Sequence, residues 1–269
     1  MGIPYAEVIG DPVAHSKSPL IHNFWLRRMN LVGDYRRTRV GAEALGDYLA
    51  ERRGDPDWRG CNVTMPCKEA IAAHLDTVDP VARRIGAINT VVPRSAGLLM
   101  GTNTDFQGAH FALCDCAPAG SKAVLLGTGG AARAVLEELR QAGAAHVTIL
   151  SRAEEKARRL LDSFGVDGAV GPIGGAPVAD LLINATPLGM EGWPPLDLDL
   201  SGLRAGATVF DLVYHPIETP LLAEARRLRL RTIDGLAMLI EQAAMAFTYF
   251  FGEPPPDRYS PELRELLTR

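Results

Sequence analysis

The stretch AVLLGTGGAA, residues 123–132, decides the fold of this 269-residue chain. Its four apolar residues fit a buried strand, and the glycine-rich turn that follows leads into an amphipathic segment at 133–141. This order of strand, turn and helix carries the G-x-G-x-x-A fingerprint of dinucleotide-binding folds. Gly127 permits the tight turn, Gly129 lets a pyrophosphate approach the backbone, and Ala132 allows close packing of the helix on the strand. The sequence therefore predicts a dinucleotide site at this turn.

The rest of the chain continues the alternation of short apolar runs with longer amphipathic stretches. After the turn, strands are predicted at 146–150, 181–184, 208–212 and 231–234, and helices at 154–161, 220–227, 236–251 and from 261 onward. Before the turn, strands are predicted at 6–9, 35–40, 61–64 and 87–92, with a helix at about 19–29 and helical patterns between the later strands. Continuous apolar strands that alternate with helices indicate a parallel sheet covered on both faces, so we expect an α/β protein.

The end of the second strand of the dinucleotide fold discriminates between NAD and NADP. An NAD site normally has Asp or Glu about 20 residues after the glycines, to hold the ribose 2′-hydroxyl. Here Ser151 and Arg152 occupy that place, with Lys156 one helical turn later. Both cations suit a 2′-phosphate. The alternative is a solvated basic helix start, where Glu154 and Glu155 dilute the charge. We predict NADP as the cofactor.

Composition excludes several classes of protein. The chain is 47% hydrophobic and 22% charged, which is ordinary for a globular protein, and its net charge of −4 leaves no basic excess for nucleic acid or a membrane surface. It has no apolar run of about 20 residues, and its first residues lack the pattern of a signal peptide. The four cysteines form no CxxC pair and read as reduced thiols without a metal. We expect a cytoplasmic protein.

Polar residues also gather in segments outside the dinucleotide fold. Ser16 and Ser18 lie at a helix entrance, where hydroxyl groups can cap the helix or hold a carboxylate. Asp105 is predicted to be either the N-cap of the helix that follows or a catalytic carboxylate. Gln242 lies within an apolar helix. If its amide is buried it needs a hydrogen-bond partner, and a ligand hydroxyl would serve.

Lys68 has an unusual predicted location. Pro66 follows a strand and fits the first position of a helix, which would put Lys68 in the first helical turn. The helix macrodipole disfavours a cation there, and desolvation would lower the pKa of such a lysine further. The alternative is an exposed surface lysine. On the first interpretation Lys68 is a candidate acid–base group.

Taken together, these segments resemble the shikimate dehydrogenase family, and the match runs in order through nearly the whole chain. The motifs that carry it are SKSP at 16–19, NVTMPCK at 62–68, GAINT at 86–90, NTD at 103–105, GTGGAA at 127–132, INATPLGM at 183–190 and DGLAMLIEQ at 234–242. Seven motifs at consistent spacing are far more specific than any one of them.

The resemblance implies a fold and an activity. It implies an N-terminal α/β substrate domain, residues 1–103 plus 239–269, and a Rossmann-like NADP-binding domain, residues 104–238, with a cleft between them. The implied activity is the reversible NADPH-dependent reduction of 3-dehydroshikimate to shikimate, with hydride delivered to the C3 carbonyl. This reaction belongs to the pathway to chorismate and the aromatic amino acids. We expect a monomer or a homodimer.

The resemblance also implies roles for individual residues. Lys68 would be the general acid–base and Asp105 its partner. The implied substrate contacts are Ser16, Ser18 and Tyr214 for the carboxylate, and Thr64, Asn89, Asp105 and Gln242 for ring hydroxyls. The implied cofactor contacts are Gly127, Thr128, Gly129, Gly130 and Ala131 for the pyrophosphate, Ser151, Arg152 and Lys156 for the adenosine phosphate, and Leu212 and Gly235 for the nicotinamide. No metal is implied.

Two other functions stay open at this point. One is a quinate or dual quinate/shikimate dehydrogenase that uses NAD, and the other is an NADP-binding regulator without turnover. The serine pair and the missing acidic residue after the second strand favour shikimate and NADP. The presence of Lys68, Asp105 and Gln242 together favours an enzyme over a regulator.

Overall fold

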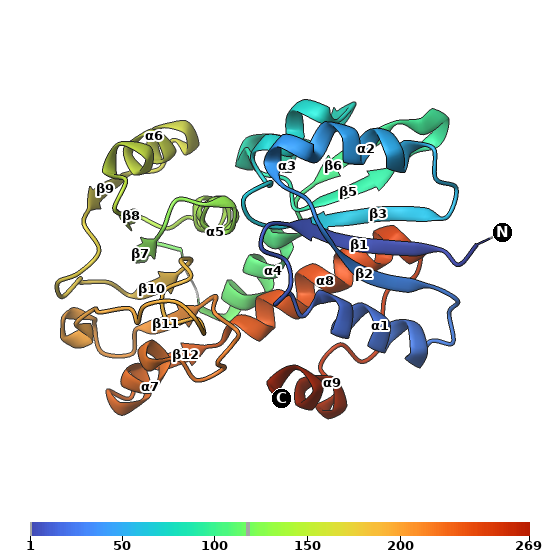
Figure 1. Cartoon of the computed structure of the whole chain (residues 1–269). Helices are drawn as coiled ribbons and strands as arrows, with labels where there is room; N and C mark the ends of the chain where they lie inside the picture. Colours follow the sequence, from blue (N-terminus) through green and yellow to red (C-terminus); the bar gives the residue numbers. More distant parts are fainter. Residues whose placement is uncertain (1, 117–118) are drawn as a thin grey trace. The chain divides into compact units, whose positions relative to one another are not determined.

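The computed structural model describes residues 2–116 and 119–269, and the chain divides into two compact units, each built around its own six-stranded sheet (Figure 1). The first unit comprises residues 1–107 and 240–269, and the second comprises Gly108–Leu239. The chain passes between the units within two helices, α4 (Thr104–Leu113) and α8 (Gly235–Phe251). In the described ranges, no helix has both the length and the apolar character that crossing a membrane requires.

The second unit contains a fully parallel sheet with the strand order β12-β11-β10-β7-β8-β9. Numbered from the first strand of the unit, this is the 3-2-1-4-5-6 order of a dinucleotide-binding fold. The prediction of a Rossmann-like unit is confirmed. Its strands are β7 (Lys122–Leu126), β8 (His146–Leu150), β9 (Gly168–Gly171), β10 (Leu181–Asn184), β11 (Thr208–Asp211) and β12 (Arg231–Ile233).

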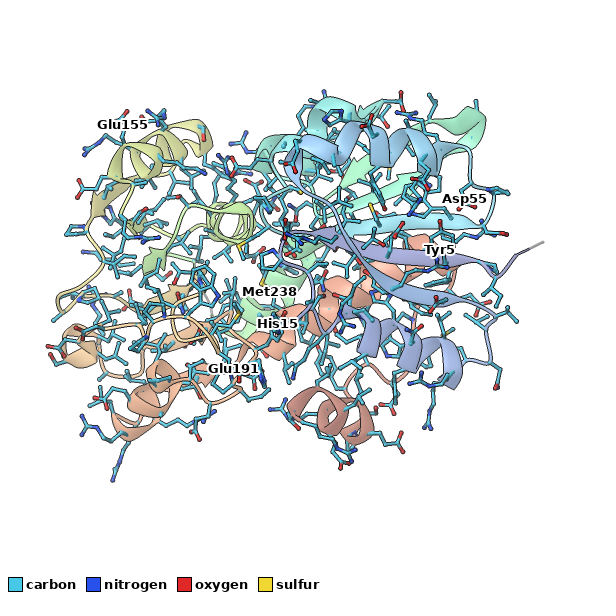
Figure 2. The ribbon with its side chains drawn as sticks, in the orientation of Figure 1. Tyr5, His15, Asp55, Glu155, Glu191 and Met238 are labelled. Atoms are coloured by element: carbon cyan, nitrogen blue, oxygen red, sulfur yellow. The ribbon has the colours of Figure 1, made fainter. Side chains whose placement is uncertain are left out.

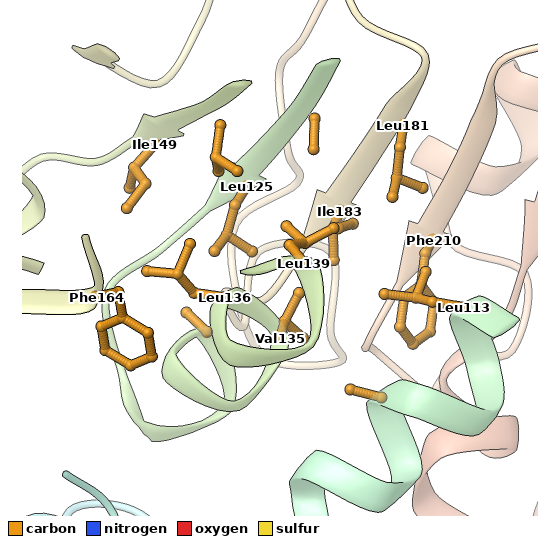
Figure 3. Packing of buried hydrophobic residues seen from close by; sticks show 14 of the residues in the cluster. Leu113, Leu125, Val135, Leu136, Leu139, Ile149, Phe164, Leu181, Ile183 and Phe210 are labelled. Atoms are coloured by element: carbon orange, nitrogen blue, oxygen red, sulfur yellow. The ribbon is translucent and has the colours of Figure 1, made fainter. Parts of the chain in front are cut away.

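Helix α5 packs its apolar face on the middle of this sheet. Val135, Leu136 and Leu139 of α5 are fully buried and form one cluster with side chains of β7, β8 and β10 (Figure 3). The helix spans Gly130–Gln141 and so begins three residues before its predicted start, because Gly130 and Ala131 carry no apolar periodicity that would reveal them as helical. The other helices of the unit are α6 (Glu154–Phe164) and α7 (Pro220–Arg227).

The first unit has a mixed sheet with the order β2-β1-β3-β5-β6-β4, in which β5 runs antiparallel to both of its neighbours. The short strands β4 and β6 have no sequence pattern strong enough to predict them. The strands are β1 (Tyr5–Gly10), β2 (Asp34–Arg39), β3 (Trp58–Val63), β4 (Thr77–Val78), β5 (Thr90–Pro93) and β6 (Leu99–Thr102). Besides most of α8, the unit contains the helices α1 (Ser18–Arg28), α2 (Leu45–Arg53), α3 (Pro80–Ile85) and α9 (Pro261–Thr268).

Helices cover both faces of this mixed sheet. Alternate residues of β1 point to opposite faces, so Ala6 and Val8 join the cluster under α8 while Tyr5 and Ile9 join the cluster under α2. Figure 1 shows α1 and α8 on one face and α2 and α3 on the other. At the outer end of the sheet the Tyr5 hydroxyl donates to Asp55 at 2.6 Å (Figure 2).

The antiparallel placement of β5 decides where polar side chains meet. Because β5 lies between β3 and β6, its amino end adjoins the carboxyl ends of both. Asn62 of β3 is opposite Thr90, and Thr90 is opposite Thr102 of β6. Three of the segments that the sequence singled out therefore converge at one edge of the sheet.

Candidate active site

Lys68 and Asp105 form the centre of the site in the first unit. The Lys68 ammonium donates to Asp105 Oδ2 at 2.5 Å, and the two side chains are 16% and 8% exposed. Lys68 lies in a turn after β3, and the next helix is a short 3₁₀ segment, Ala70–His74. The prediction that Lys68 lies in the first turn of a helix is therefore wrong. Lys68 is instead held by Asp105, which lies in the first turn of α4.

Asp105 is not the N-cap of α4. Thr104 and Asp105 are already helical, and the Asn103 side chain accepts a hydrogen bond from the Phe106 N–H at 3.2 Å. Asn103 also donates to the Ala87 carbonyl at 2.7 Å. The capping role predicted as one alternative for Asp105 thus belongs to Asn103, and the Asp105 carboxylate faces other partners.

Asn89 orients that carboxylate. Its amide nitrogen donates to Asp105 Oδ1 at 2.8 Å and to the Thr104 hydroxyl at 2.9 Å, and its amide oxygen accepts from the Thr104 N–H at 2.7 Å. A backbone N–H can only donate, so this contact fixes which end of the Asn89 amide faces Asp105. One carboxylate oxygen of Asp105 is therefore held by Asn89 and the other by Lys68.

Behind Asn89 lies a buried set of hydrogen bonds that sequence reasoning missed. Thr90 donates to the Asn89 amide oxygen at 3.0 Å, Asn62 donates to the Thr90 hydroxyl at 2.9 Å, and Tyr35 donates to Asn62 Oδ1 at 2.6 Å. Asn62 and Thr90 belong to the motifs NVTMPCK and GAINT, and this membership was the sequence signal that could have identified them. Nothing in the local sequence marks Tyr35, because its role depends on strand pairing.

The two serines lie next to each other at the start of α1. Ser16 donates to the Ser18 hydroxyl at 3.2 Å, and the Ser18 N–H donates to Ser16 Oγ at 3.3 Å. Two cations hold their loop: Arg37 donates to the Ser16 carbonyl from Nε at 3.0 Å and Nη2 at 2.5 Å, and Lys17 donates to the Leu267 carbonyl at 2.5 Å. Hydroxyl groups near two cations suit an anionic ligand group.

The other two predicted substrate contacts of this unit lie on separate elements. Thr64 directly follows β3, four positions before Lys68, and its N–H donates to the Ile9 carbonyl at 2.8 Å. Gln242 lies in α8 and is 9% exposed, so it meets the condition of burial under which the sequence analysis expected a partner for its amide.

In the second unit, two glycines of the turn after β7 differ in their surroundings. Gly127 has φ +104°, and a Cβ there would lie 3.1 Å from the Ala185 carbonyl oxygen. A Cβ at Gly129 would meet nothing within 4 Å, so the turn has open space on the side of Gly129. Thr128 lies in the turn between the two glycines, and Gly130 and Ala131 are the first two residues of α5. It lies where the strand order of the sheet reverses, which is where such sheets bind nucleotides.

The turn after β8 carries the residues predicted for the adenosine phosphate. Ser151 is buried and its hydroxyl accepts from the Ala153 N–H at 3.0 Å, which shapes the turn before α6. Arg152 is exposed, and Lys156 is partly buried in the first turn of α6. Glu155 projects outward from the same turn of the helix (Figure 2).

The residues predicted to lie beside the nicotinamide are in contact. A Cβ at Gly235 would collide with the Leu212 carbonyl oxygen, so only glycine fits there. Tyr214, two residues after Leu212, is partly buried. Sequence reasoning missed the residue that holds this segment, Asp211, which is fully buried and accepts from Asn184 at 2.9 Å, Thr219 at 2.7 Å and the Val213 N–H at 3.1 Å. Burial raises the pKa of Asp211.

Comparison with known proteins connects this geometry to a family. Residues 8–91 match the model of the shikimate dehydrogenase substrate binding domain, and residues 235–259 match that of the shikimate 5'-dehydrogenase C-terminal domain. The shikimate dehydrogenase (NADP(+)) of Sphingopyxis alaskensis is 53% identical over 265 residues, which are 98% of this chain and 97% of that protein. The chain belongs to the shikimate dehydrogenase family. The resemblance inferred from the motifs is confirmed. The prediction of an NADP-dependent oxidoreductase is confirmed with it.

Solved structures of this family and its relatives share the whole fold. Shikimate 5-dehydrogenase from Thermus thermophilus, in complex with NADP(H) and shikimate, matches with a TM-score of 0.81 and 38% identity, covering 98% of each chain. A 5-ketofructose reductase from Gluconobacter sp. strain CHM43 matches with a TM-score of 0.87 and 30% identity, covering 99% of this chain and 98% of that one. One fold thus serves different substrates, and the choice of substrate depends on the side chains of the site.

Proposed function

We propose that this protein catalyses the reversible NADPH-dependent reduction of 3-dehydroshikimate to shikimate. The observation that carries the proposal is the arrangement of Lys68, Asp105 and Asn89, in a chain that is 53% identical to a shikimate dehydrogenase. A partly buried ammonium held by an oriented carboxylate is equipped to give and take back a proton.

Each residue of this group has a separate task. NADPH supplies the hydride when it is bound, and reduction of a ketone leaves a negative charge on its oxygen. Lys68 donates the proton to that oxygen and, in the oxidative direction, accepts it again. Asp105 orients Lys68 through Oδ2, and Asn89 orients Asp105 through Oδ1. General acid–base catalysis of this kind contributes on the order of 10² to 10⁴ in rate.

We infer that the first unit, residues 1–107 and 240–269, binds the substrate. The predicted substrate domain, 1–103 plus 239–269, ends four residues earlier at the first boundary, and Asp105 lies within the unit. The hydroxyls of Ser16 and Ser18 hold the carboxylate, joined by Tyr214. The ring hydroxyls are held by a set of side chains from the edge of the sheet and from α8: Thr64, Asn89, Asp105 and Gln242. The adjacency of the two serines and their two neighbouring cations support the carboxylate assignment.

We infer likewise that the second unit, Gly108–Leu239, binds NADP, with bounds close to the predicted 104–238. The pyrophosphate lies on the turn formed by Gly127, Thr128, Gly129, Gly130 and Ala131, where the space beside Gly129 supports the assignment. Ser151, Arg152 and Lys156 hold the adenosine phosphate, and Leu212 and Gly235 lie beside the nicotinamide. The guanidinium of Arg152 in place of a carboxylate supports NADP over NAD.

We also propose a cytoplasmic location and a monomer or homodimer. The location is supported by Cys61 and Cys67, which are buried free thiols of the kind that reducing compartments maintain.

Steady-state kinetics on the purified protein tests the proposed reaction. We expect kcat/KM for shikimate with NADP⁺ to exceed that for quinate with NAD⁺. The reverse order would assign the chain to quinate dehydrogenases. A protein that binds NADPH but never consumes 3-dehydroshikimate would be a regulator, and the proposal would fail.

A further inference from the structure

The end of the chain, residues 252–269, contacts two helices of the first unit that carry proposed substrate contacts. It follows α8, which carries Gln242, and it ends in α9, which packs against α1 (Figure 1). Ser18 is the first residue of α1. We call residues 252–269 the C-terminal segment. It therefore connects the helix of a proposed ring-hydroxyl contact with the helix that begins at the proposed carboxylate subsite.

Lys17 joins α9 to the serine pair. It lies between Ser16 and Ser18 in the sequence, and its carbonyl accepts the first hydrogen bond of α1. Its ammonium donates to the Leu267 carbonyl at 2.5 Å, in the last turn of α9, and Leu267 is fully buried. The last carbonyls of a helix have no partner within it, and the helix dipole favours a cation at this end. One residue thus links the backbone that presents both serines to the end of a packed helix.

Glu241 of α8 holds the other end of α9. It is 6% exposed, and its carboxylate accepts from Arg258 at 2.6 Å and from the Tyr259 hydroxyl at 2.8 Å. The next residue, Ser260, is the N-cap of α9. A buried carboxylate that loses a charged partner is strongly destabilised, so this contact fixes the place where α9 begins. Helix α9 is therefore attached at its start to α8 and at its end to the serine loop.

We propose that the C-terminal segment positions the serine pair for the substrate carboxylate, with Lys17 and Glu241 as its positioning residues. The proposal rests on the proposed function, in which the two serines bind that carboxylate. Both hydroxyls must converge on one anionic group, and a loop that has to be ordered on binding reduces affinity. Lys68 and Asp105 are held by a separate contact with Asn89. Loosening the segment should therefore weaken substrate binding and leave turnover of the bound substrate nearly unchanged.

Lys17→Met removes the ammonium and keeps a long side chain. We expect the KM for shikimate to rise about fivefold, the change that loss of one hydrogen bond typically produces, with kcat and the KM for NADP⁺ within about twofold of wild type. The matched control is Arg28→Gln. Arg28 and Glu262 also join α1 to α9, at 3.5 Å, but both side chains are exposed. Exposed ion pairs contribute little, so this variant should keep the kinetic constants of the wild type.

Arg258→Met separates positioning from a direct attraction between Lys17 and the substrate carboxylate. It leaves the serine loop and its cations in place, and it should raise the KM for shikimate about threefold by releasing the start of α9. In the double variant with Lys17→Met the two effects should combine to less than their product, because both release the same helix. A wild-type KM in Arg258→Met would show that Lys17 acts by its charge on the substrate, and would overturn the proposal. Fully independent effects in the double variant would overturn it as well.

Hydrogen exchange of the unliganded protein provides a readout that does not depend on activity. Exchange in residues 16–21 should become faster in Lys17→Met and in Arg258→Met, but not in Arg28→Gln. Unchanged exchange in both of the first two variants, or equal acceleration in all three, would contradict the proposed link. If Lys17→Met yields no folded protein, Arg258→Met carries both measurements. A wild-type protein inactive on shikimate would instead refute the proposed function, and it would leave the exchange experiment as the test of the link.

Discussion

The Lys68 ammonium can exchange a proton with a substrate, a task that arginine cannot perform at any working pH. Replacing Lys68 with Ala should therefore lower kcat by about two orders of magnitude or more, and Lys68→Arg should fail similarly although it keeps the charge. Steady-state rates with saturating shikimate and NADP⁺ measure the effect. Lys122→Ala is the control, because Lys122 is exposed at the start of β7. Turnover of Lys68→Arg close to wild type would contradict acid–base catalysis by this residue.

His22 makes the stability of the first unit sensitive to acid. Burial lowers its pKa to about 3, and in the described part of the chain neither ring nitrogen has a hydrogen-bond partner. Between about pH 6.5 and pH 3 the unfolded chain binds a proton that the folded chain does not, so stability falls as the pH falls through this window. From about pH 6.5 to pH 5 this single group should remove up to about 2 kcal/mol of the free energy of unfolding.

Urea unfolding of His22→Phe at these two pH values measures that contribution. The phenyl ring keeps the stacking on Tyr35 and removes the titrating group, so the loss of stability on acidification should shrink. His74→Gln serves as the control because His74 is exposed, and it should retain the full loss. Equal acid sensitivity of wild type and His22→Phe would mean that other groups dominate the transition.

Two glycines near the turn between β7 and α5 are expected to matter for different reasons: Gly127 for the fold and Gly129 for cofactor binding. Gly127 has φ +104° and its Cα faces the Ala185 carbonyl, so Gly127→Ala should destabilise the second unit by about 1 kcal/mol or more. Gly129 has φ −81° and open space beside it, so Gly129→Val should leave the Tm unchanged. The valine would occupy the place proposed for the pyrophosphate and raise the KM for NADP⁺ at least about tenfold. Thermal unfolding and NADP⁺ titration separate the two effects. A Gly129→Val enzyme with a normal KM would place the cofactor elsewhere.

The elements differ in how far the sequence reveals them. The predicted bounds of β8 and β10 agree with the structure, because apolar residues dominate both strands and turn or helix signals flank them. The turn around Lys68 was mispredicted because Pro66 has the same signature at a helix start and in this turn. The links from Tyr35 to Asn89 could not be predicted, since they depend on which strands pair and in what register.

For the molecule as a whole, each unit encloses its own hydrophobic clusters and carries one set of proposed ligand contacts. The motifs identify the residues proposed to bind the substrate and those proposed to bind the cofactor. They do not say whether each ligand can bind when the other is absent. All the proposed catalytic and substrate-binding residues except Tyr214 belong to the first unit, and all the proposed cofactor-binding residues belong to the second. Each ligand should therefore bind and stabilise mainly its own unit when it is added alone.

Hydrogen exchange measured by mass spectrometry tests this division of labour. NADP⁺ alone should slow exchange in residues 127–133 and 151–156, because bound phosphates engage backbone N–H groups at those turns. Shikimate alone should slow exchange in residues 16–21 and 103–107, around the serine pair and Asp105. At about 100 times its dissociation constant, each ligand should add about 2.7 kcal/mol to the stability of the unit that binds it. Quinate with NADP⁺ omitted is the control for specificity. Protection of residues 127–133 by shikimate alone, or of 16–21 by NADP⁺ alone, would contradict the assignment of substrate and cofactor to separate units.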